Sequence, residues 1–201
     1  MRRLNIFRLL IALTVLLLTA CGGIQVDRVD PDKEIALTDQ WNDKDSALVA
    51  EEMITDMVSF PWLREYELDQ RRKPTVIVQR VQNRSHEHIP VATFINELKR
   101  SMIRSGRVDF VVGGEERDAV RQERLDQELN ASAETQAAIA EETGANFALS
   151  GSIDSIVDEL DGKRATFYQV DLKLIDMTKN IEVWNGQKKL KKLQRKTRFG
   201  F

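Results

Sequence analysis

The sequence contains a single cysteine, Cys21, among its 201 residues. One thiol cannot supply an internal disulfide, a thiolate zinc site or an iron–sulfur cluster, so these three kinds of structure are excluded. Prolines and glycines are also scarce, at 4 and 10, which excludes collagen-like and proline-rich low-complexity chains. Long apolar runs are equally rare, and the clearest one lies within the first twenty residues.

Neither sign of charge dominates the chain. It carries 30 basic and 32 acidic residues, for a net charge of −2 at pH 7. Without a strong basic field, we expect no nucleic acid among the partners. A hydrophobic share of 42% and a charged share of 31% are typical of a soluble globular protein. The length of 201 residues leaves room for one ordinary domain with short appendages.

The first twenty residues have the pattern of a secretory signal. Met1–Arg8 is short and positively charged, and Leu9–Leu18 is apolar apart from Thr14. This run is shorter than the roughly 20 residues that span a bilayer. It ends in Leu-Thr-Ala-Cys at positions 18–21, a string that resembles the bacterial lipobox. The resemblance implies cleavage of residues 1–20 and lipid attachment at Cys21. The alternatives are a membrane helix or a plain signal with an incidental cysteine.

The residues next to the predicted anchor suggest where it is sorted. Gly22, rather than Asp, follows the cysteine, and by resemblance to the sorting rule of enteric bacteria this predicts an outer-membrane lipoprotein that faces the periplasm. Several acyl chains, each contributing about 0.8 kcal/mol per buried CH₂, make a stable membrane anchor. Residues 21–40 are polar and aperiodic, and we interpret them as a flexible tether.

The opposite end of the chain is basic. From Gln187 to Phe201 there are seven basic residues and no acidic one, and we assign residues 191–201 to a basic tail. Such a tail is either a solvated terminus or a contact with an anionic surface, such as lipid headgroups or an acidic partner.

Residues 41–190 alternate between helical and strand patterns. Apolar spacing and caps predict helices from Asn42 or Asp45 to Val58, and over residues 61–68, 90–103, 115–129 and 132–139. β-branched or alternating runs predict strands over residues 75–81, 108–112, 146–157, 164–176 and 181–190. This order predicts an α/β fold, a single domain in which one mixed β-sheet is covered by helices.

Several stretches of this region resemble the LpoB family of lipoproteins that activate penicillin-binding proteins. They are, in the order of the family, Trp41–Ile54, Pro74–Val78 with Asn83–Ser85, Ser105–Arg107, Ala131–Thr135 and Glu142–Ile153. The resemblance implies a fold similar to the amino-terminal domain of the TolB translocation protein. It also implies an outer-membrane lipoprotein that reaches through the cell wall and stimulates a bifunctional peptidoglycan synthase, a class A penicillin-binding protein. Because no interface motif of the family matches position by position, the partner-binding residues stay unknown.

No grouping of residues predicts a reaction, a metal site or a cofactor. His86 and His88 lie two positions apart in a polar loop without a third ligand. Asp39, Asp43 and Asp45 lack the glycine and glutamate of a calcium loop and are more simply capping groups. Motifs for a phosphate-binding loop and for a nucleophile elbow are missing. We therefore expect no enzyme and no catalytic residue.

An exported and tethered domain without chemistry of its own predicts a binding role. Candidate contact surfaces are the polar loop Asn83–His88, the face around Trp62 and the acidic helix Glu115–Glu128. Each has a simpler alternative: a surface loop, a core tryptophan and a solvated helix face. Two other functions also stay open. One is a periplasm-facing lipoprotein of unknown partner, and the other is a secretion-apparatus lipoprotein similar to the curli exporter.

Overall fold

The computed structural model describes residues 27–30, 38–130 and 144–195. The chain divides into two compact units, residues 1–35 and 36–201, and the helices and strands described all belong to the second. No helix in the described part of the chain combines the length and the apolar character needed to cross a membrane. Cys21, the predicted signal of residues 1–20 and the helix expected over residues 132–139 lie outside the described residues.

Two consecutive helices open the second unit. α2 (Asp43–Ser59) begins with a capping box, in which the side chains of Asn42 and Asp45 each accept a hydrogen bond from the backbone N–H of the other. α3 (Pro61–Gln70) begins at Pro61, which suits the first turn because an N–H at that position has no partner within the helix.

Two further helices follow strands of the sheet. α4 (Val91–Ser105) ends at Gly106 with φ 63°, a left-handed conformation that glycine adopts without steric cost. The buried residues of α4, Phe94, Leu98 and Met102, lie about one turn apart and form a single stripe. α5 (Gly114–Asn130) contrasts with α4, because none of its described side chains is buried.

Five strands form one mixed sheet in the order β2-β1-β3-β4-β5. They are β1 (Thr75–Asn83), β2 (Asp109–Phe110), β3 (Phe147–Leu160), β4 (Lys163–Asp176) and β5 (Ile181–Arg195). β1 runs parallel to β2 and β3, whereas β4 runs antiparallel to its two neighbours, β3 and β5. The parallel pairing of β1 with β2 needs a long crossover, which α4 supplies. The arrangement confirms the predicted α/β fold with a single mixed sheet.

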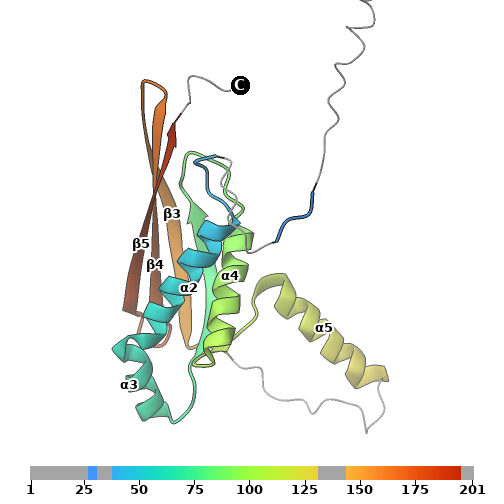
Figure 1. Cartoon of the computed structure of the whole chain (residues 1–201). Coiled ribbons are helices and arrows are strands. Elements are labelled where there is room, and N and C mark those ends of the chain that lie inside the picture. Colours follow the sequence, from blue (N-terminus) through green and yellow to red (C-terminus); the bar gives the residue numbers. More distant parts are fainter. Residues whose placement is uncertain (1–26, 31–37, 131–143, 196–201) are drawn as a thin grey trace, which may run out of the picture. The chain divides into compact units, whose positions relative to one another are not determined.

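The hydrophobic core lies between one face of this sheet and helices α2 and α4 (Figure 1). Because side chains alternate along a strand, the buried hydrophobic side chains of β4 all point to that face. They are Tyr168, Val170, Leu172 and Leu174. The helices contribute Val49, Ala50, Met53, Ile54, Met57, Phe94, Leu98 and Met102. None of the described helices covers the opposite face, which we call the open face of the sheet.

β2 and β5 differ most in length from the sequence-based prediction. β2 is only two residues long, because the chain leaves the sheet after Phe110 and Val111 makes one last backbone bond to Val76. β5 continues to Arg195, because β4 begins at Lys163 and pairs with β5 along its whole length. Residues 191–195, which the sequence analysis assigned to the basic tail, therefore belong to the sheet.

Candidate functional site

The polar loop Asn83–His88 is held in one shape by the side chain of Asn83. Asn83 Oδ1 accepts hydrogen bonds from the backbone N–H and the hydroxyl of Ser85, at 2.9 and 2.6 Å. Asn83 Nδ2 donates to the backbone oxygen of Glu87 at 2.8 Å. A side chain that bonds to its own loop in this way takes the place of regular secondary structure. The loop is thus formed without help from a partner.

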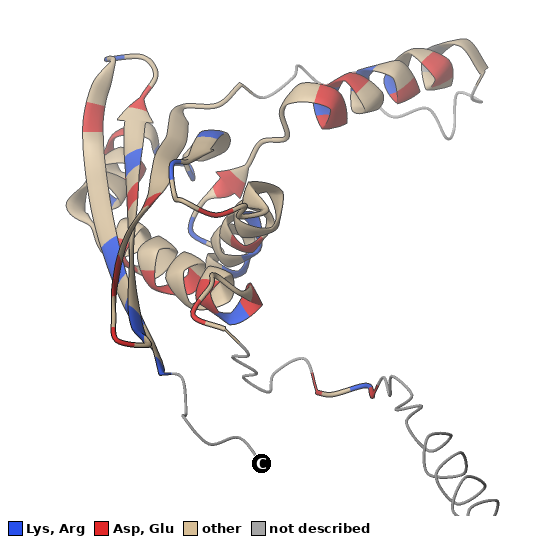
Figure 2. Ribbon diagram, turned by 90° about the horizontal axis from the view of Figure 1, so that it is seen from above, with Lys and Arg blue, Asp and Glu red and all other residues tan. Residues whose placement is uncertain are grey.

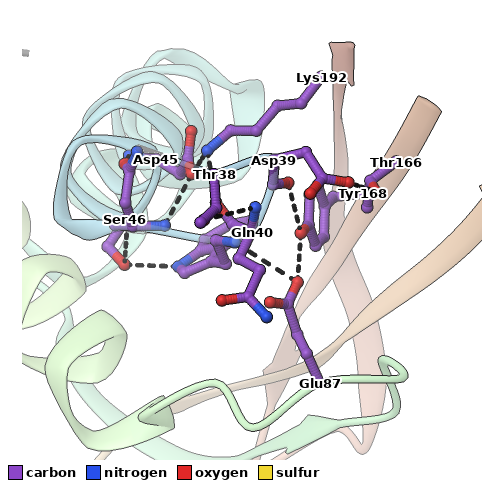
Figure 3. Close-up of polar contacts among 11 residues, drawn as sticks. Thr38, Asp39, Gln40, Asp45, Ser46, Glu87, Thr166, Tyr168 and Lys192 are labelled. Atoms are coloured by element: carbon purple, nitrogen blue, oxygen red, sulfur yellow. Dashed lines mark hydrogen bonds and ion pairs between the residues drawn. The ribbon is translucent and has the colours of Figure 1, made fainter. Parts of the chain in front are cut away.

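Glu87 of this loop belongs to a second group of polar contacts, which we call the polar cluster. Its members are Asp39, Trp41, Glu87, Arg164, Thr166 and Tyr168. The last three residues alternate along β4 and so point to its helix-covered side. The remaining members come from the segment before α2 and from the loop (Figure 3). The cluster therefore joins three parts of the chain that are far apart in the sequence.

Tyr168 lies at the centre of the polar cluster. Its hydroxyl is in hydrogen-bonding contact with Glu87 Oε1 and lies 3.0 Å from the backbone oxygen of Asp39 (Figure 3). Burial, followed by the hydrogen bond to Glu87 and the nearby carboxylates, raises the pKa of Tyr168 above its ordinary value. The phenol therefore keeps its proton at neutral pH and acts as a hydrogen-bond donor rather than as a base.

Asp39 anchors the chain that enters the domain. Its side chain is buried, Thr166 Oγ1 donates to Asp39 Oδ2, and Arg164 Nε lies 3.0 Å from the same oxygen. A buried carboxylate needs such partners to offset the loss of water. Residue 39 was assigned to the flexible tether of residues 21–40 on the sequence alone, yet it is fixed to β4.

A second ion pair lies beside the polar cluster. Lys192 of β5 stands opposite Thr166 in the sheet register. The Lys192 ammonium group donates to Asp45 Oδ2 and, at 2.7 Å, to the backbone oxygen of Gln40. Asp45 is thus shared between the capping box of α2 and Lys192, which supports its interpretation as a capping group.

The polar cluster and this second ion pair hold the segment before α2, and the start of α2, against strands β4 and β5. Asp39 and Asp45 each form an ion pair with a cation, and Glu87 accepts a hydrogen bond from the Tyr168 hydroxyl. His86 and His88 are both exposed, and His86 Nδ1 lies 2.5 Å from Ser155 Oγ. Within the described residues, no group of three or more His, Cys, Asp and Glu side chains is placed to hold a metal ion.

Trp62 belongs to the core and not to a contact surface. Its side chain is 6% exposed, and its indole N–H donates to the backbone oxygen of Met57 at 2.8 Å. Its ring packs against Phe147 with 4.8 Å between centroids. Of the two interpretations that the sequence left open for Trp62, the structure supports the core.

The predicted acidic helix corresponds to α5, along which acidic residues are interspersed with basic ones (Figure 2). Its apolar residues Val120, Leu125 and Leu129 are all exposed. Lys99 of α4 forms an ion pair with Glu116 at 3.2 Å. A helix that is charged all round and buries no stripe is typical of a solvated element, and this favours the simpler alternative.

The open face of the sheet is a candidate surface that was not predicted from the sequence. A groove of about 520 Å³ lies among strands β1, β3, β4 and β5, and its lining includes Arg80, Arg84, Ser150, Ser152, Asp171 and Lys173. The alternation of polar and apolar residues in β4 predicts one wet face. Which residues of the other strands join it depends on the strand register, which the sequence does not reveal.

The fold and the site define a small α/β domain whose buried charged groups are paired with one another, with one sheet face left open. The chain belongs to the LpoB family, because the family model described as "Peptidoglycan-synthase activator LpoB" matches residues 45–190. The family description refers to the activation of a synthase and not to a reaction of its own. The match includes α2 from residue 45, strands β1 to β4, and β5 as far as residue 190, and it confirms the resemblance seen in the sequence.

Solved structures of this family are similar to the chain at low identity. The LpoB C-terminal domain from Escherichia coli is 16% identical over 73% of this chain and 98% of that chain, with a TM-score of 0.45. The NMR structure of E. coli LpoB is 15% identical over 88% and 87%, with a TM-score of 0.41. The LpoB C-terminal domain from Salmonella enterica is 15% identical over 70% and 94%, with a TM-score of 0.40. A comparison with curated proteins gives no match.

Proposed function

We propose that this chain is an outer-membrane lipoprotein, anchored through Cys21, that binds and activates a bifunctional peptidoglycan synthase from the periplasmic side. The observation that carries the proposal is the family match over residues 45–190, which spans nearly all of the described α/β unit. The signal pattern of residues 1–20 and the tether that follows it support the location. By this proposal the synthase is a class A penicillin-binding protein, and the chain regulates cell-wall synthesis.

Activation requires a preference for one state of the synthase. A binding protein shifts a conformational equilibrium only by the difference between its affinities for the two states. A tenfold enrichment of a rare active state needs a preference of about 1.4 kcal/mol. A rigid domain such as this one, with its entry segment fixed by Asp39 and its loop fixed by Asn83, can supply that preference by contact alone.

The first test measures glycan polymerisation. The full acylated chain, purified from membranes in detergent, is added to each bifunctional synthase of the source cell together with its lipid-linked substrate. We expect the polymerisation rate of at least one synthase to rise, on the order of tenfold, if the preference is that estimated above. Penicillin added in a parallel reaction blocks transpeptidation and separates the two activities. If the rate of every bifunctional synthase stays at its level in detergent alone, the proposed function is wrong.

The second test concerns the anchor. Cells that express the full chain are fed a clickable palmitate analogue, and we expect the label on the wild-type protein but not on Cys21→Ser, because the only thiol has been removed. A Gly22→Asp variant serves as the matched control: it should keep the label but move from the outer to the inner membrane in an enteric host. An unlabelled wild-type protein would contradict the lipid anchor and leave the synthase assay unaffected.

A further inference from the structure

The open face of the sheet carries charges that the fold itself does not neutralise. β5 shows this most clearly, because its lysines are sorted by strand alternation. Lys188 and Lys192 point to the helix-covered side and form ion pairs with Glu52 and Asp45 of α2. Lys189 and Lys191 point to the open side and are exposed. Neither has an ion-pair partner within the described residues. The fold thus uses one pair of lysines and leaves the other pair free.

Basic residues also lie on the open side of the neighbouring strands. Lys173 of β4 and Arg80 of β1 line the groove of the open face, and neither forms an ion pair with a described residue. The open face also carries acidic residues. Asp171 accepts hydrogen bonds from Gln169 at 2.7 Å and from Gln187 at 2.8 Å, Asp154 accepts one from Ser152, and Glu182 in the groove lining accepts one from Asn185. Asp158 lies opposite Ala165 on the same face. The open face therefore carries both signs of charge. Lys173, Lys189 and Lys191 have no ion-pair partner among the described residues, while Asp154, Asp171 and Glu182 are held by hydrogen bonds.

Apolar side chains adjoin these lysines on the same face. Ile156 of β3 is directly opposite Phe167 of β4, which in turn is opposite Lys191 of β5. Ile156 is 67% exposed, and Leu193, two residues beyond Lys191, is 55% exposed. Single exposed apolar residues are ordinary, but here the register places Ile156 in one row with Phe167 and Lys191. Leu193 lies in the next row, with Ala165 and Asp158. An apolar centre with a charged rim is the usual composition of a protein interface.

We propose that the open face is the surface through which this chain binds the synthase, and that the complementary surface of the synthase is acidic with an apolar side chain at its centre. This inference rests on the proposed function and adds to it the surface and the chemistry of the partner. Charge complementarity favours a protein with an acidic surface over an anionic membrane. The open face combines its lysines with a fixed carboxylate, which is held by Gln169 and Gln187. A folded protein surface can complement both signs of charge, whereas the phosphates of a membrane would repel the Asp171 carboxylate.

The test reverses the charge at Lys189 and Lys191, the two lysines of β5 that point to the open side. Binding of the full acylated chain in detergent to the immobilised synthase is measured for the wild type and for Lys189→Glu/Lys191→Glu at several salt concentrations. We expect the variant to bind at least tenfold more weakly at low salt, and the wild-type affinity to fall more steeply with salt, because the lost contacts are electrostatic. Lys189→Gln/Lys191→Gln, which removes the charges without reversing them, should bind with an intermediate affinity. Thermal unfolding shows whether each variant is folded.

A matched control makes the same change of charge elsewhere. Arg64→Glu/Arg124→Glu alters one exposed residue on α3, near Trp62, and one on α5. It therefore also tests two of the three contact surfaces that the sequence suggested. We expect it to bind within twofold of the wild type. If this control loses binding while Lys189→Glu/Lys191→Glu keeps it, the open face is not the binding surface.

The remaining outcomes separate this inference from the proposed function. If the wild type, Lys189→Glu/Lys191→Glu and Arg64→Glu/Arg124→Glu all bind the synthase equally, the open face is not the binding surface, but the proposed function is unaffected. If the wild type binds no bifunctional synthase, both are wrong. A third outcome is that the lysine variants bind the synthase normally but lose binding to vesicles that contain phosphatidylglycerol. The open face would then be a membrane contact, which also overturns the inference.

Discussion

Replacing Phe94 with alanine should lower the free energy of unfolding by about 3–5 kcal/mol, because a buried ring is lost and the cavity collapses only in part. Phe94 is 0% exposed and belongs to the stripe of α4 that faces the sheet. Its ring packs edge-on against Trp41, with 6.1 Å between centroids. Denaturant unfolding followed by tryptophan fluorescence measures the change, and Trp41 should report the loss of its neighbour directly.

The same helix supplies the control for this prediction. Ile103 is 62% exposed, so Ile103→Ala removes an aliphatic side chain from α4 without opening a cavity. We expect its effect on the free energy of unfolding to stay within about 0.5 kcal/mol. Equal costs for the two variants would mean that α4 does not pack on the sheet through Phe94, and the described core would be wrong.

The core and the fold class were predictable because they are encoded locally. The spacing of Phe94, Leu98 and Met102 predicts a helix with one buried stripe, and the alternation from Tyr168 to Leu174 predicts a strand with one buried side. Each signal needs only a few neighbouring residues. The ends of β2 and β5 were less well predicted, because a strand ends where its partner stops pairing and not where its own pattern changes.

The polar cluster could not be predicted, because its contacts join distant parts of the chain. Tyr168 and Glu87 are 81 positions apart, and Thr166 and Asp39 are 127 apart. Nothing in the residues around Asp39 distinguishes it from Asp43, which is exposed. The two sets of lysines on β5 are likewise identical in sequence terms. Only the placement of α2 over one face decides that Lys188 and Lys192 are paired while Lys189 and Lys191 are not.

Asp39 also marks the point where any tether must end. If residues 38–40 are fixed to the sheet, the folded domain begins at residue 38 and any tether ends before it. The alternative is that the tether runs on to Trp41, the first residue of the domain predicted from the sequence. The two possibilities differ in one measurable quantity, the contribution of Asp39 to stability.

Replacing Asp39 with alanine should lower the free energy of unfolding by about 3 kcal/mol. The change leaves the Thr166 hydroxyl, 1% exposed, without its acceptor and leaves Arg164 without its carboxylate. The cost is near the lower end for a broken buried pair, because the Arg164 side chain is 32% exposed and keeps some water. Asp43→Ala, in the first turn of α2, is the matched control and should cost about 0.3–1 kcal/mol through the helix dipole.

A double-mutant cycle with Arg164→Ala then separates the ion pair from the rest of the effect. If Asp39 and Arg164 interact as the structure shows, the double variant should lose less stability than the sum of the two single variants, since residues in contact are not additive. Equal costs for Asp39→Ala and Asp43→Ala, together with additive effects in the cycle, would mean that residue 39 is not fixed. The flexible tether would then extend to Trp41, and the anchored entry segment invoked for activation would have to be abandoned.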